Sequence, residues 1–173
     1  MSTYTLGPED GILSVRTSRT GAVAKAGHDL LIHVTEWTAR LDTGDEPSLA
    51  LDADATSLRV REGSGGIKPL DEDDLENIET TIDDEVLLQR DINFRSTSAQ
   101  RDGDTLTVTG ELTLVGATRP IAFDLSLTDG RVAGVAVVKQ TEWGMKPYTA
   151  LFGALKVADE VRVEIDAALP QSR

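Results

Sequence analysis

The sequence contains no cysteine among its 173 residues, and this absence excludes whole classes of chemistry. Disulfides, thiolate nucleophiles and cysteine-based zinc or iron–sulfur sites all require that residue. Histidine is scarce too, with only His28 and His33 present. The two positions differ in parity, so on a regular strand the side chains face opposite sides and do not share a metal. We therefore expect no metal site and no required cofactor.

Catalytic motifs are also missing. The adjacent His28 and Asp29 are the most catalytic-looking pair, but no GxSxG motif accompanies them. The loop at 63–66, Gly-Ser-Gly-Gly, lacks the lysine and the spacing of a phosphate-binding loop. We expect His28 to hydrogen-bond or to lie at a rim, and we expect no catalytic residues and no enzymatic activity.

Basic residues are few, 17 against 30 acidic ones, which gives a net charge of −13. Such a balance, without a local basic stripe, argues against binding to nucleic acid and to anionic membrane surfaces. No apolar run approaches the ~18 residues of a membrane-spanning helix. The first residues, MSTYTLGPEDG, show neither a basic region nor an apolar core of a leader. We expect a soluble, cytoplasmic protein.

Aromatic residues make up only 4% of the chain. Trp37 and Trp143 are read mainly as core anchors, with pocket lining as the alternative. Most other apolar positions are Leu, Val, Ile or Ala. Medium-sized aliphatic side chains leave room for an apolar cavity inside a β structure, and a filled core is weighed equally at this point.

Most apolar residues recur with a period of two, which is typical of half-buried strands. The clearest runs are 48–57, 105–115, 121–127 and 160–169, and shorter or less regular ones lie at 12–17, 30–41, 92–98 and 131–141. The long run 30–41 does not keep one parity, which predicts a bulge or bend. Asp102-Gly103 and Asp129-Gly130 predict tight hairpin turns, and a loop at 116–120 separates two runs that should pair. About eight antiparallel strands favour a closed barrel, and a two-sheet sandwich is the alternative.

One region reads as helical. Leu75, Ile78 and Ile82 lie at helical spacing within residues 70–87, and residues 71–85 hold nine acids and no bases. The acids do not follow the EF-hand pattern, so a solvated acidic helix is expected rather than a calcium site. Alternatively, this helix is the contact surface for a basic partner of a non-catalytic barrel with a filled core.

Several motifs together resemble the YceI-like family of bacterial lipocalin-like proteins. They are DINFRSTSA at 91–99, GELTLVGATRPIAFDLSL at 110–127, Glu142-Trp143-Gly144 and the opening Tyr4-Thr5-Leu6. The acidic segment 70–87 lies where the family has its short helices. The chain departs from the family at Asp10-Gly11, where His-Ser is usual, and at Gln140, where a basic residue is common. Many relatives are exported.

The resemblance implies an eight-stranded antiparallel barrel, with one domain over residues 1–173, that holds an apolar or amphipathic chain and has no catalytic residues. The expected ligand is a polyisoprenoid, an isoprenoid quinone or a fatty-acid-like lipid, held as by a carrier, store or scavenger. A homodimer through an exposed barrel edge is a further hypothesis. The residues predicted to contact the ligand are Leu49, Leu51, Phe94, Leu112, Leu114, Phe123, Leu125 and Val163 inside the barrel, with Trp143 and His28 at its rim.

Overall fold

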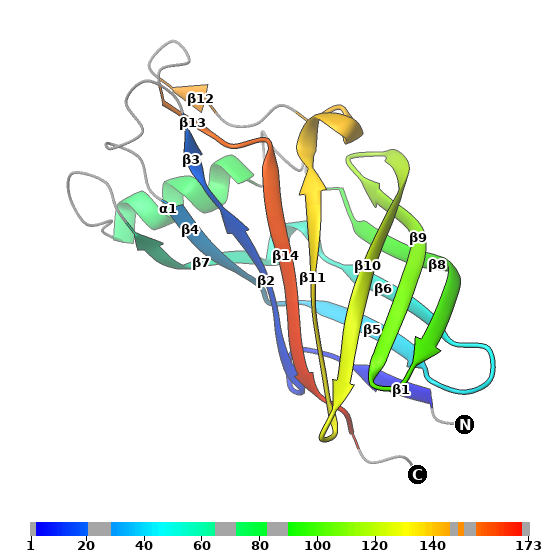
Figure 1. The fold of residues 1–173 in the computed structure, drawn as a ribbon. Helices are drawn as coiled ribbons and strands as arrows, with labels where there is room; N and C mark the ends of the chain where they lie inside the picture. The colour runs from blue at the N-terminus through cyan, green and yellow to red at the C-terminus, as the bar shows by residue number, and fades with distance from the viewer. Residues whose placement is uncertain are drawn as a thin grey trace.

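The computed structural model describes residues 3–20, 29–64, 72–82, 90–145, 149–150 and 155–170, and these form an antiparallel β structure with one α-helix (Figure 1). The strands are β1 (Thr3–Leu6), β2 (Gly11–Thr17), β3 (Arg19–Thr20), β4 (Asp29–Val34), β5 (Trp37–Asp42), β6 (Ser48–Ala53), β7 (Leu58–Ser64), β8 (Ile92–Asp102), β9 (Thr105–Leu114), β10 (Ala117–Thr128), β11 (Arg131–Lys139), β12 (Thr149–Ala150), β13 (Leu155–Val157) and β14 (Glu160–Ala168). The helix α1 covers Glu72–Thr81, and 3₁₀ turns cover Ala55–Ser57 and Gln140–Trp143.

Eleven strands form one curled sheet in the order β1-β5-β6-β8-β9-β10-β11-β14-β2-β4-β7, and β12, β13 and β3 form a small second sheet. Three pairs of strands are the two halves of longer, bent strands. β5 pairs with β1 on one side and with β6 on the other. β4, which precedes β5, pairs with β2 on one side and with β7 on the other. Counted in this way the sheet has eight strands and returns on itself, because β6 also pairs with β8 and β2 with β14. The lipocalin-like barrel predicted from the sequence is confirmed.

The bend between β4 and β5 accounts for the irregular parity of residues 30–41. At this point the Thr35 N–H donates to Ser57 O at 2.9 Å, and the Asp54 N–H donates to Glu36 O at 3.0 Å. These two bonds carry the pairing across the bend from β4–β7 to β5–β6. A further register shift lies between Leu31 and Ile32. The predicted irregularity is therefore confirmed as a corner that lets the ribbon wrap around the barrel.

Asp54 supports this corner, and its protonation should weaken it. Its carboxylate accepts bonds from the Thr56 N–H at 2.8 Å and the Thr56 hydroxyl at 2.7 Å. The Thr56 hydroxyl, followed by the Thr56 N–H, holds the pKa of Asp54 below its usual value of 3.8. A carboxyl with a lowered folded-state pKa stabilises the fold above its unfolded-state pKa, and this contribution is lost as the pH falls through the folded-state pKa.

We expect Asp54→Asn to reduce the free energy of unfolding at neutral pH, and to reduce it less once the pH is below the pKa of folded Asp54. Denaturant unfolding of both proteins at the two pH values measures this difference. Asp45→Asn, an exposed carboxylate between β5 and β6, controls for general loss of surface charge. A wild-type advantage over Asp54→Asn that is the same at both pH values would show that the ionised form of Asp54 does not hold the corner.

The predicted hairpin turns are present, with one correction. Gly103 follows Asp102 with a positive φ, and Asp129 and Gly130 have φ of 54° and 72° between β10 and β11. The expected loop at 116–120 is wrong in extent. The turn consists of Val115 and Gly116 alone, and β10 begins at Ala117. Residues 118–120 pair with β9 because a two-residue turn already satisfies the connection.

The barrel wall is not paired along its whole length. β10 and β11 pair only between residues 125–128 and 131–134. Residues 117–124 of β10 pair only with β9, and residues 135–139 of β11 pair only with β14. The two strands therefore separate over this length. Pro120 lies in this part of β10, where the missing N–H costs no bond to a second neighbour. At the far end the Arg119 Nε–H donates to Glu142 O at 2.9 Å and bridges the two walls again.

Helix α1 occupies a second interruption in the wall, beside β7. Its apolar stripe, Leu75, Ile78 and Ile82, packs against the core as the spacing predicts. The Glu79 carboxylate reaches the edge of β7 and accepts a hydrogen bond from the Val60 N–H at 2.9 Å. Glu72 and Asp73 are exposed. The helix therefore presents acids to solvent and an apolar face to the interior.

Candidate ligand-binding cavity

The barrel encloses a cavity of about 480 Å³. Inward-facing side chains from strands all around the curled sheet, together with side chains from α1, line it. Cavities of this size are typical of small-molecule sites in proteins. The interior of the barrel is therefore not filled by its own side chains, and the alternative of a filled core is wrong.

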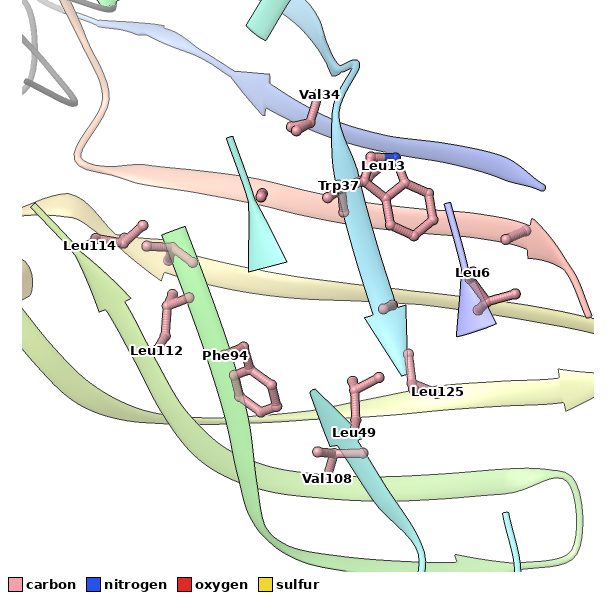
Figure 2. Packing of buried hydrophobic residues seen from close by; sticks show 14 of the residues in the cluster. Leu6, Leu13, Val34, Trp37, Leu49, Phe94, Val108, Leu112, Leu114 and Leu125 are labelled. Carbon is pink, nitrogen blue, oxygen red and sulfur yellow. The ribbon is translucent and has the colours of Figure 1, made fainter. Parts of the chain in front are cut away.

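The eight residues predicted to point inward all line this cavity, and Figure 2 shows several of them extending into the space between the strands. They are Leu49 and Leu51 on β6, Phe94 on β8, Leu112 and Leu114 on β9, Phe123 and Leu125 on β10, and Val163 on β14. The rings of Phe94 and Phe123 lie with centroids 5.3 Å apart and planes tilted by 55°. Their role in binding a ligand stays a prediction.

The two predicted rim residues have different outcomes. Trp143 lies in the 3₁₀ turn after β11, is 3% exposed and is not among the described lining residues. Its Nε1–H donates to Leu112 O at 2.8 Å, so the indole is buried against β9 and not at an exposed rim, which corrects the predicted position. His28 lies outside the described residues. Trp37 is buried, is likewise absent from the described lining, and its Nε1–H has no acceptor among the described residues.

Several lining residues were not predicted from the sequence to face a cavity. Asn77, Ile78 and Ile82 come from α1, and Gln140 and Met145 come from the turn after β11. The stripe on α1 was visible in the sequence, but the period shows only that one face is apolar. It does not show that this face closes a barrel. Gln140 lies near the end of the run 131–141, which is apolar on both faces, so parity alone does not say which face is inside, and Met145 follows a 3₁₀ turn where no period applies.

The cavity wall is almost entirely apolar. All described lining residues are apolar except Thr17, Asn77 and Gln140, and none carries a charge. Charged residues instead form ion pairs between neighbouring strands on the exposed face of the sheet. Arg131 contacts Asp166 at 2.6 Å, Arg95 contacts Asp52 at 2.9 Å, and Arg16 contacts Glu164 at 3.0 Å. The inside therefore favours hydrocarbon and the outside favours water.

The separation of β10 and β11 adjoins the cavity. Val135 on β11 lines the cavity and is also 39% exposed. Ile121 and Phe123 line it from the part of β10 that does not pair with β11. The cavity therefore reaches a residue exposed to solvent where these two strands diverge.

Metal and membrane features are absent from the part of the chain that the structure describes. No three His, Asp or Glu side chains there are grouped so as to hold a metal ion. In the same residues no helix has the length and apolarity needed to cross a membrane.

Comparisons with known proteins agree with this architecture. The family model described as YceI-like domain matches residues 22–169. The crystal structure of BcnA from Burkholderia cenocepacia is similar over 90% of this chain and 94% of its own, with a TM-score of 0.64 and 14% identity. The YCEI protein of Campylobacter jejuni is similar over 82% and 85%, with a TM-score of 0.55 and 15% identity. A mutant of it with a monobromobimane guest has a TM-score of 0.58 and 14% identity over the same shares. No curated protein matches by sequence.

Proposed function

The chain belongs to the YceI-like family, and on that basis we propose that its barrel binds a long apolar or amphipathic ligand. The ligand class is a polyisoprenoid, an isoprenoid quinone or a fatty-acid-like lipid. The protein holds it as a carrier, store or scavenger and does not transform it. The single observation that supports this function most is the cavity of about 480 Å³ with its apolar wall.

The energetics of such a cavity suit a hydrocarbon tail. Each methylene group taken out of water contributes about 0.8 kcal/mol. A wall of mainly Leu, Val, Ile and Phe side chains presents few polar groups along a tail, and Gln140 is the one buried polar residue among the described lining residues. Affinity would therefore come from tail burial, and selection between similar tails would be weak.

The volume limits how much of a tail lies inside. At about 480 Å³ the cavity lies in the range of sites that hold one small molecule. A short prenyl or fatty chain fits within it. A longer polyisoprenoid would need to leave the barrel, and the separation between β10 and β11 is the described part of the wall that offers such a route.

Non-catalytic binding is also part of the proposal. The cavity presents no charged side chain from the described residues. General acid–base or nucleophilic catalysis needs a titratable or activated group within reach of the substrate. The alternative function is a non-catalytic barrel that contacts a basic partner through the acidic helix. It gives no reason for an apolar cavity inside the barrel.

Native mass spectrometry of the purified protein, followed by organic extraction, tests the proposed function. We expect a stoichiometric apolar adduct, or uptake of added farnesol with a rise in Tm. Ligand at about 100 times its Kd stabilises a protein by about 2.7 kcal/mol. Lysines in place of Glu72 and Asp73, which lie on the exposed face of α1, should leave uptake unchanged. A protein that carries no adduct and takes up neither prenyl nor fatty probes would contradict the proposal.

A further inference from the structure

The polar side chains of the cavity wall are gathered at one end of the barrel. Thr17 is the last residue of β2 and Gln140 follows the last residue of β11. Figure 1 shows both strands ending at the side of the molecule where α1 lies, and α1 supplies Asn77. The opposite end is lined by aliphatic residues such as Leu6, Leu41 and Leu49. An amphipathic ligand would therefore place its head group beside Gln140.

Ala158 holds the two strand ends together. Its N–H donates to Ser18 O at 2.7 Å, one residue beyond Thr17. Its carbonyl oxygen accepts from the Gln140 side chain at 3.2 Å. Because a carbonyl oxygen can only accept, the Gln140 group that faces Ala158 is the NH₂. The orientation of the Gln140 amide is thereby fixed.

This orientation leaves the Gln140 carbonyl oxygen for the cavity. The residue is only 5% exposed, it lines the cavity, and its Oε1 accepts no hydrogen bond from any described residue. An acceptor that lines an otherwise apolar cavity favours a ligand that supplies a donor to it. Gln140 is the only buried polar residue of the described cavity wall.

Thr17 provides the complementary group. Its Oγ1 accepts from the Leu30 N–H at 3.3 Å, and its hydroxyl proton takes part in no described bond. An acceptor on Gln140 and a donor on Thr17 match a hydroxyl group, which donates and accepts at once. None of the described lining residues is charged, so none of them would neutralise a carboxylate or phosphate placed here.

We infer that the cavity selects a long-chain alcohol over an anionic lipid of the same tail, with the hydroxyl held between Gln140 and Thr17. This inference rests on the proposed function, because it assigns the head group of a ligand bound in that cavity. Binding of farnesol and farnesoic acid at neutral pH tests it, since the two share one tail and differ in the head. Displacement of an apolar fluorescent probe reports the affinity of each.

The wild-type protein should bind farnesol at least about 10-fold more tightly than farnesoate, the difference expected when a charge is buried unpaired. Gln140→Leu should weaken farnesol about 5-fold and leave the probe's own affinity unchanged. Thr17→Val, which keeps the side-chain shape, should weaken farnesol about 3-fold and serves if Gln140→Leu does not fold. Gln100→Leu, on the exposed face of β8 and absent from the described lining, is the matched control and should change neither.

The outcomes separate the two proposals. A wild-type protein that takes up neither the probe nor either ligand overturns the proposed function, and the inference with it. Uptake of the probe together with equal affinities for farnesol and farnesoate overturns the inference alone. Tighter binding of farnesoate also overturns it, because a cation would then meet the head group. Unchanged farnesol affinity in both Gln140→Leu and Thr17→Val would show that the head group lies elsewhere.

Discussion

Val163→Trp is expected to abolish ligand uptake while the protein stays folded. Val163 lines the cavity from β14, and its partners on the neighbouring strands are Val15 and Ala136, both short side chains that also line it. An indole at this position extends into the void instead of into packed atoms. If it displaces only three methylene groups of a tail, the loss is about 2.4 kcal/mol, which is about 50-fold in affinity. Titration with farnesol, with displacement of an apolar fluorescent probe, measures it.

Arg162→Trp is the matched control for this experiment. Arg162 is the preceding residue of β14, it is exposed, and it is absent from the described lining. The same indole is thus placed on the other face of the same strand. Arg162→Trp should bind as the wild type does, and both variants should keep cooperative unfolding. If Val163→Trp is folded and binds farnesol with wild-type affinity, the ligand does not occupy this cavity.

Gly110→Ala is expected to be among the most destabilising substitutions in the barrel. Gly110 lies on β9 opposite the register shift of β8 between Ser96 and Ser98. A Cβ at this position would collide with the Arg95 carbonyl oxygen, lie 2.5 Å from the Phe94 ring and lie 2.7 Å from Ser96 Cα. Two of these neighbours are backbone atoms, which cannot move without disturbing the sheet. We expect a loss of about 3 kcal/mol in the free energy of unfolding, measured with denaturant.

Gly103→Ala separates this steric effect from backbone strain. Gly103 has a φ of +60° in the β8–β9 turn and no atom within 4 Å of its would-be Cβ. Alanine there meets only the left-handed penalty of about 1 kcal/mol. Gly110→Ala should therefore cost clearly more, and it should also weaken ligand uptake, because the Phe94 ring must shift. Equal losses in the two variants would show that the close approach at Gly110 is not a constraint.

The strands and their inward faces were predictable because the alternation is local. Leu106 and Val108 are fully buried while Thr105 and Thr107 are exposed, as the parity of that run requires. The helical stripe at Leu75, Ile78 and Ile82 was equally local. In these segments the pattern of each residue with its near neighbours already decides which side faces the core.

The empty interior was not predictable in the same way. Parity states which face is inside, but the free volume depends on the radius of the closed sheet, which the number and stagger of paired strands determine. Those pairings join distant segments, such as β2 with β14. The same limit explains Trp143, because its burial depends on a 3₁₀ turn that brings its indole N–H to Leu112 O on β9. Gln140 lies near the end of the run 131–141, which is apolar on both faces, so its parity did not mark it as inward.

The bond from the Val60 N–H to Glu79 has a consequence for how the molecule behaves among other copies of itself. Among the described strands β7 pairs only with β4, so its outer edge offers backbone groups to any extended chain that approaches. α1 lies over this edge, and a carboxylate takes up one of its donors. Exposed strand edges are templates for aggregation, and natural proteins cover them or place charges on them. A helix that is both acidic and docked does both, so the segment that lines the cavity also leaves less of the β7 edge open to another strand.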